Sequence, residues 1–181
     1  MKRLTTKEIL AASFKEIAEK KNIDKITVKD IVDNCGYSPA TFYRHFTDKY
    51  DLIAWNYVRE STQIMGKISD EYSWRETLSD GALYFWQNRE YIKNLCTHTG
   101  GHDSFVRNMA QINIGLLEAE VKKSLGEKPV CDETLLLIKT YCMGTVAAVC
   151  EWIIGNIEAT PELMAKMFED ALPEPLKKYL Y

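Results

Sequence analysis

Residues 27–46, TVKDIVDNCGYSPATFYRHF, constrain the fold of this chain more than any other segment. Thr27 is a good helix N-cap, and Asp30 three positions later completes a capping box. Apolar residues then recur at helical spacing as far as Gly36, a residue type that often ends a helix in the left-handed conformation. The Ser-Pro pair that follows supplies the cap and the first position of a second helix. The segment therefore predicts two short helices joined by a tight turn.

The second of these helices has two chemically different faces. Phe42 and Phe46, four positions apart, form an inward face, while Thr, Tyr, Arg and His residues lie between and beside them. This layout is typical of a helix-turn-helix, which places its second helix in the DNA major groove. Two amphipathic helices around a glycine turn also occur in helical domains that bind no DNA, with the polar groups as a solvated face. The spacing alone leaves both interpretations open.

The neighbouring segments favour the DNA-binding interpretation. ILAASF at residues 9–14 precedes the motif, and FTDKYDLI at residues 46–53 follows it. Taken together, residues 5–53 resemble the DNA-binding domain of the TetR/AcrR family of bacterial transcriptional regulators. The resemblance implies a homodimer on a palindromic operator, a repressor as the first expectation, and DNA contacts from matching positions. Those positions are Lys29, Tyr37, Pro39, Ala40, Thr41, Tyr43, His45 and Lys49.

The chemistry of these side chains suggests how the contacts divide. The small residues at the start of the recognition helix, residues 39–41, can approach base edges and thymine methyl groups. Lys29 can reach a guanine edge or a phosphate. Donors suited to phosphate oxygens are carried by Thr27, Tyr43, His45 and Lys49. Apart from Arg44, the recognition helix has no Gln, Asn or Arg, the side chains that read bases through bidentate hydrogen bonds. We therefore expect selection by DNA shape or through water.

The charge of the chain is unevenly distributed. A formal net charge of -3 argues at first against a nucleic-acid partner. However, residues 1–50 carry ten Lys and Arg against seven Asp and Glu, whereas residues 51–181 carry thirteen against nineteen. The net charges of +3 and -6 indicate a small basic DNA-binding region on an acidic body.

The composition favours a cytoplasmic protein. The polar start MKRL leads into no apolar signal region. The longest uncharged apolar stretch, residues 140–150, is far shorter than the about 20 residues of a membrane span. Five cysteines in apolar surroundings are an odd number with no paired spacing, so we expect them to be reduced.

The chain predicts an all-α fold of about nine helices. We expect a helix-turn-helix domain over residues 1–48 and a helical effector-binding and dimerisation domain over 49–181. A long fourth helix from Asp48 to about residue 67 would link them mechanically. The apolar helices predicted at about 132–156 and 160–172 would form a four-helix interface between two subunits. The alternative is that they pack only within one subunit.

The middle of the chain predicts a ligand pocket, because aromatic walls with a few polar groups suit a small molecule. The candidate ligand-binding residues are Trp86, Tyr91, His98, His102, Met109 and Asn113. Ordinary core packing is the competing interpretation for each of them. Cys96, His98 and His102 raise the possibility of a metal site, but Gly100 and Gly101 interrupt the helix that would align them. We therefore expect no metal and no cofactor.

Residues 82–92, ALYFWQNREYI, resemble a compact C-terminal type that includes regulators of dihydroxyacetone-kinase operons. That resemblance implies control by a partner protein in some members. An enzyme is disfavoured, since the chain has no glycine-rich phosphate loop, no H-E-x-x-H and no recognisable nucleophile setting. A helical protein-interaction module without DNA binding leaves Lys29, Tyr43, His45 and Lys49 unexplained. The leading hypothesis is a dimeric DNA-binding regulator controlled by an effector or a partner.

Overall fold

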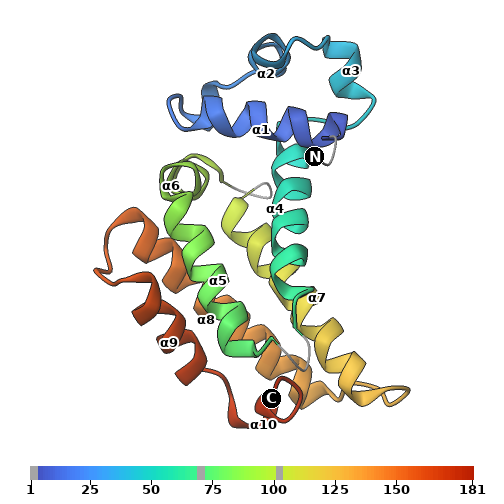
Figure 1. Ribbon diagram of the computed structural model, residues 1–181, viewed down its shortest axis with the longest axis vertical. Coiled ribbons are helices and arrows are strands. Elements are labelled where there is room, and N and C mark those ends of the chain that lie inside the picture. The colour runs from blue at the N-terminus through green and yellow to red at the C-terminus, as the bar shows by residue number, and fades with distance from the viewer. Residues whose placement is uncertain (1–3, 69–71, 101–103) are drawn as a thin grey trace.

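The computed structural model of the chain describes residues 4–68, 72–100 and 104–181, and these residues form helices without any strand. Figure 1 shows α1–α3 grouped at one end of the molecule and α4 running from them into a larger helical body. The elements are α1 (Thr6–Ala18), η1 (Ile23–Lys25), α2 (Val28–Cys35), α3 (Pro39–Tyr43), α4 (Lys49–Met65), α5 (Trp74–Gln87), α6 (Arg89–His98), α7 (Phe105–Leu125), α8 (Asp132–Ile154), α9 (Pro161–Asp170) and α10 (Glu174–Lys177). The predicted all-α fold is confirmed.

Local signals in the sequence set the N-terminal helices. Thr5 and Glu8 form a capping box at α1, and the predicted box of Thr27 and Asp30 forms at α2. The inward faces of α1, α2 and α3 then share one core, in which Phe14, Phe42 and the residues around them are fully buried. The buried members are Leu10, Phe14, Ile23, Ile26, Ile31, Val32, Phe42 and Phe46. This packing fixes the orientation of α3 relative to α1 and α2.

Helix α4 belongs to both parts of the molecule. The Asp48 carboxylate accepts the backbone N–H groups of Tyr50 and Asp51 at 2.8 and 2.9 Å, which begins the helix as predicted. Leu52 and Ile53 are buried in the same core as α1–α3, whereas Tyr57, one turn further on, packs edge-to-face on Phe105 of α7. A displacement of α4 therefore moves groups at both ends.

The body is built around α8. This helix packs mainly on α7 and α6, while α9 lies along α5 (Figure 1). By length and composition α8 is the one helix in the described part of the chain that could cross a membrane. Here it carries buried residues along its whole length, from Thr134 to Ile153, as the core helix of a helical body does.

The sequence missed two short elements. Residues 23–25 form the 3-10 turn η1, and Pro175 lies in the first turn of an additional helix, α10, beyond the last predicted helix. A proline is tolerated in the first helical turn because the N–H it lacks would have no partner there. The described residues accordingly form ten α-helices, one more than the about nine predicted.

Candidate DNA interface and ligand cavity

The turn between α2 and α3 has the geometry that the sequence predicted. Gly36 adopts φ +72°, in the left-handed region, and the Tyr37 N–H donates to the Val32 carbonyl at 2.9 Å. Ser38 Oγ then accepts the Thr41 N–H at 3.2 Å, with Pro39 in the first helical position. The chain is thus reversed in a few residues, and α3 begins with its first turn clear of the core.

Helix α3 divides into a buried and an exposed face. Phe42 has no exposed surface, while Tyr43 next to it is 60% exposed and packs edge-to-face on the Phe42 ring. Pro39, Ala40 and Arg44 are also exposed. These exposed side chains do not cover the core, so they are free to contact another molecule. Together they form one surface at the end of the molecule.

The other candidate DNA residues lie around this surface. Thr27 and Lys29 are exposed, and Tyr37, Thr41 and His45 are half-buried. The Lys29 ammonium pairs with the Asp33 carboxylate, and that hydrogen bond raises the Lys29 pKa. The Thr27 hydroxyl is engaged with the Asp30 carboxylate at 2.8 Å. A phosphate contact by Thr27 would compete with the helix cap.

The Lys49 side chain is engaged with the backbone of the η1 segment. Its Nζ donates to the backbone carbonyls of Ile23, Asp24 and Ile26 at 2.7, 3.2 and 2.9 Å. An ammonium group has three N–H donors, so these carbonyls occupy all of them. Burial lowers the Lys49 pKa. Lys49 therefore braces the η1 segment, a role that needs the folded chain to bring residues 23–26 next to α4.

Arg44 was absent from the predicted contacts although it lies on the same exposed surface. It follows the last residue of α3, and its guanidinium lies 3.4 Å from the Thr41 hydroxyl. Arg44 could have been included among the predicted contacts because it is a basic residue in the recognition segment, and guanidinium groups pair with phosphates and guanine edges.

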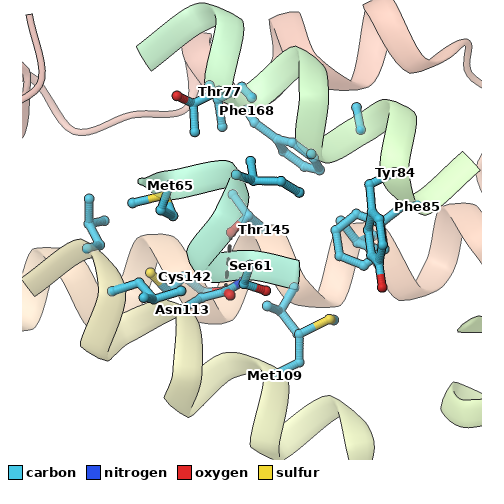
Figure 2. A pocket seen from close by; sticks show the side chains of 18 of the residues that line it. Ser61, Met65, Thr77, Tyr84, Phe85, Met109, Asn113, Cys142, Thr145 and Phe168 are labelled. Atoms are coloured by element: carbon cyan, nitrogen blue, oxygen red, sulfur yellow. Dashed lines mark hydrogen bonds between the residues drawn. The ribbon is translucent and has the colours of Figure 1, made fainter. Parts of the chain in front are cut away.

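The second candidate site is a cavity of about 130 Å³ in the body. Figure 2 shows side chains from several helices pointing into it, among them Ser61, Asn113 and Phe168. The wall is contributed by α4, α5, α7 and α8, with Phe168 from α9. Because the first turns of α4 belong to the core of α1–α3, the cavity wall is connected directly to the helix-turn-helix.

Only part of the predicted ligand set lines this cavity. Met109 and Asn113 do. Trp86 instead stacks on Trp152 outside it, with ring centroids 5.5 Å apart, and Tyr91 packs edge-to-face on Phe14 of α1. His98, half-buried at the end of α6, does not line the cavity either. His102 lies outside the described residues.

These corrections have one physical cause. A helix in a bundle presents different residues to different neighbours, and composition does not reveal which face meets which helix. Sequence analysis missed wall residues of α4 and α8, including Tyr57, Ser61 and Thr145. Their signal is weak, since a polar residue within an apolar helix is as common in ordinary packing as at a cavity. Among the described residues no group of three or more His, Cys, Asp and Glu is placed to hold a metal; the Cys96 thiol lies 3.3 Å from Cys150.

The wall of the cavity has low polarity. Burial raises the pKa of the Tyr57, Tyr84 and Tyr141 hydroxyls, and it raises the pKa of the Cys142 thiol to about 12. All four groups are therefore neutral at ordinary pH. The Tyr57 O–H donates to Asn113 Oδ1 at 2.9 Å, which joins α4 to α7 across the wall.

Comparison with known proteins matches the N-terminal part of the chain to a family model and about half of the chain to a curated relative. Residues 5–54 match the family model described as bacterial regulatory proteins, tetR family. The curated HTH-type dhaKLM operon transcriptional activator DhaS of Lactococcus lactis subsp. lactis is 24% identical over 94 residues. That match covers 52% of this chain and about half of the relative, 50% of its length.

Two solved structures resemble the whole chain. A structure described as dihydroxyacetone kinase operon activator DhaS superposes with a TM-score of 0.70 and 19% identity, covering 99% of this chain and 100% of that one. A TetR transcriptional regulator from Streptococcus agalactiae 2603V gives a TM-score of 0.64 and 17% identity, covering 93% and 94%. At these identities the likeness concerns the fold.

The described residues thus form a capped helix-turn-helix mounted on a helical body. The N-terminal domain is a helix-turn-helix domain of the tetR family, and the chain as a whole has the fold of TetR-family regulators.

Proposed function

We propose that the chain is a cytoplasmic homodimeric regulator that binds a palindromic operator through α2 and α3 and responds to an effector in the body. The observation that carries the proposal is the exposed surface of α3, held by a correctly formed turn and backed by the buried Phe42. The division into residues 1–48 and 49–181 is part of this proposal. The alternative function, a protein-interaction module that does not bind DNA, would leave this exposed surface unexplained.

Phosphate and base contacts would come from this surface and its surroundings. Pro39, Ala40 and Thr41 lie at the start of α3, where small side chains let the helix approach base edges. Tyr43 and Arg44 are exposed donors suited to phosphates. Lys29, Tyr37 and His45 lie on the adjoining surface, and we now assign Lys49 to bracing rather than to DNA.

A second copy of the chain is supported by α8 and α9. Helix α8 exposes Leu136 and Met143, 65% and 60% exposed, seven positions apart on one stripe. Helix α9 exposes Leu163 and Met167, while Met164 and Phe168 of the same helix are buried. Large exposed apolar side chains in a row mark an interface. Pairing these helices would give the two-fold arrangement that a palindromic operator needs.

Control would pass through α4. Its first turns contribute Leu52 and Ile53 to the N-terminal core, and its later turns contribute Tyr57, Ser61 and Met65 to the cavity wall. Two recognition helices must lie about 34–36 Å apart to enter successive major grooves, so a small tilt of α4 would weaken binding. The relative DhaS is named an activator, and the position of the operator decides between activation and repression.

The test is DNA binding by single variants as a function of salt. We expect Tyr43→Ala and Arg44→Ala to weaken binding to the DNA upstream of the gene, and Arg44→Ala to reduce the salt slope by about one. Lys128→Ala, an exposed basic residue between α7 and α8, is the matched control and should change neither quantity. Wild-type affinity and slope in both α3 variants would refute the assignment.

A further inference from the structure

The polar groups of the cavity indicate the chemical class of its ligand. We propose that the cavity binds a small, uncharged, mainly apolar molecule that presents a hydrogen-bond acceptor such as a carbonyl oxygen. This inference rests on the proposed function, because it specifies the effector of the same regulator.

The wall is without formal charge. Of the 21 described residues that line the cavity, none is Asp, Glu, Lys, Arg or His, although charged residues make up 27% of the chain. An ion transferred from water into such a wall loses its hydration and gains no counter-charge. Anionic and cationic metabolites are therefore disfavoured.

One buried hydrogen-bond donor of the wall has no protein partner among the described residues. Trp74 is 4% exposed, and by its geometry the buried indole Nε1–H makes no hydrogen bond to any described residue. A buried donor without an acceptor costs free energy, and native structures rarely retain one without a reason.

Three hydroxyl donors of the wall are already used within the protein. Thr77 donates to the Ser73 carbonyl at 3.1 Å and Thr145 to the Tyr141 carbonyl at 2.9 Å, both within their own helices. The Tyr141 hydroxyl donates to the Phe168 carbonyl at 2.8 Å. The Trp74 indole offers a ligand an unused donor, so a ligand that carries an acceptor is favoured.

The size of the cavity sets the scale of the molecule. At about 130 Å³ it is close to the engineered apolar cavity of about 150 Å³ that accommodates benzene in another protein. A single six-membered ring with one oxygen substituent matches this space. Cyclohexanone is therefore a suitable probe, since it combines an apolar ring with one carbonyl acceptor.

The experiment measures binding of cyclohexanone to the full-length protein without DNA, by ligand-observed NMR and by thermal shift. Cyclohexylammonium and cyclohexanecarboxylate serve as charged counterparts, and toluene as a ring without an acceptor. We expect cyclohexanone to bind, toluene to bind more weakly, and neither ion to bind in the same concentration range. Binding of an ion as tight as that of cyclohexanone, or no binding of cyclohexanone, would overturn the proposal.

Two tryptophan variants make the test specific. Trp74→Phe removes the unpartnered N–H and keeps an aromatic ring, so it should weaken cyclohexanone binding about fivefold, as expected for one hydrogen bond, and leave toluene binding unchanged. Trp152→Phe is the control, because the Trp152 N–H already donates to the Ala159 carbonyl at 2.9 Å and does not line the cavity. Equal cyclohexanone affinities in all three proteins would refute the role of Trp74.

The DNA-binding assay separates this proposal from the proposed function. A protein that binds its operator but not cyclohexanone would refute the ligand class and leave DNA binding standing. A protein that binds cyclohexanone as described but no DNA would refute the proposed function and leave the ligand class standing.

Discussion

The side chain of Asn94 in α6 holds the backbone at Ile23, just ahead of the helix-turn-helix. The Ile23 N–H donates to Asn94 Oδ1 at 3.1 Å, and Asn94 Nδ2 donates to the carbonyls of Ala18 and Lys21 at 2.6 and 2.8 Å. One amide thus satisfies three backbone groups at the end of α1 and in the turn beyond it. Helix α6 is a second connection, beside α4, between the body and the DNA-binding end.

Replacing Asn94 by Ala should loosen this connection. Three backbone groups would lose their partner, which we expect to lower the free energy of unfolding by about 1–3 kcal/mol. Operator affinity should fall as well, because the start of the helix-turn-helix would be held less firmly. Urea unfolding and DNA titration measure the two effects. Lys93→Ala, an exposed neighbour on α6, is the control. Equal stability of both variants would show that the Asn94 contacts contribute nothing.

Replacing Lys49 by Met should lower stability without altering the salt dependence of DNA binding. The ammonium group bonds three carbonyls of the η1 segment, and its loss should cost about 1–2 kcal/mol, since the group is only partly buried. The exposed Lys29 offers the comparison: Lys29→Met removes only a surface ion pair and should hardly change stability. A reduced salt slope with unchanged stability in Lys49→Met would restore the phosphate role.

Two glycine-to-alanine substitutions should shift stability in opposite directions. Gly81 lies within α5, and a Cβ there meets no atom within 4 Å. Gly81→Ala should therefore stabilise by about 1 kcal/mol through helix propensity. Gly36 has φ +72°, so Gly36→Ala should destabilise by about 1–2 kcal/mol. Thermal unfolding measures both, and a shift of the same sign in the two variants would contradict the assigned backbone conformations.

Acid should destabilise the N-terminal domain through its capping carboxylates. Hydrogen bonds from Thr5 lower the Glu8 pKa below its ordinary 4.5, and bonds from Lys21 and then Thr27 lower the Asp30 pKa below 3.8. The unfolded chain takes up protons at the ordinary values and the folded chain only at lower pH. The contribution to stability is therefore complete above about pH 5 and is lost as the pH falls below about 4.

The melting temperature of the protein, followed from about pH 6 to about pH 3, measures this effect. Asp30→Asn keeps a side-chain acceptor for the Thr27 N–H but cannot titrate, so its curve should be flatter than that of the wild type. Identical curves for the two proteins would show that Asp30 does not contribute to the acid sensitivity.

A charge on the exposed stripe of α8 should separate the proposed dimer. Met143→Glu places a carboxylate where an apolar contact with a second copy is expected, and burying an unpaired charge is costly. Analytical ultracentrifugation should give a dimer for the wild type and a monomer of unchanged helicity for the variant. Glu151→Gln, an exposed position of α8, is the control. A wild-type monomer at micromolar concentration would contradict the interface.

The helix-turn-helix itself was predictable in detail because its signals are local. The capping box of Thr27 and Asp30, the left-handed Gly36 and the cap at Ser38 each act within about four residues of their position. Such signals need no knowledge of the rest of the fold. The periodicity of Phe42 and Phe46 likewise showed which face of the recognition helix turns inward.

The set of residues that line the cavity depends on long-range packing, so the sequence predicted it poorly. Tyr91 and Trp86 look like wall residues by composition, yet one packs on Phe14 and the other on Trp152. Tyr57 and Trp74 line the cavity because α4, α5 and α8 meet around it. Which helices face each other is set by the sum of many small contacts, which no short motif contains.

The sequence by itself determined the helices, the turn and the surface of α3, since hydrogen bonds and periodicity between near neighbours suffice for them. The tertiary structure alone decided that Lys49 braces three carbonyls, that Asn94 ties α6 to α1, and that uncharged side chains surround the cavity. These relationships join residues 23 or more positions apart, so they exist only once the chain has packed.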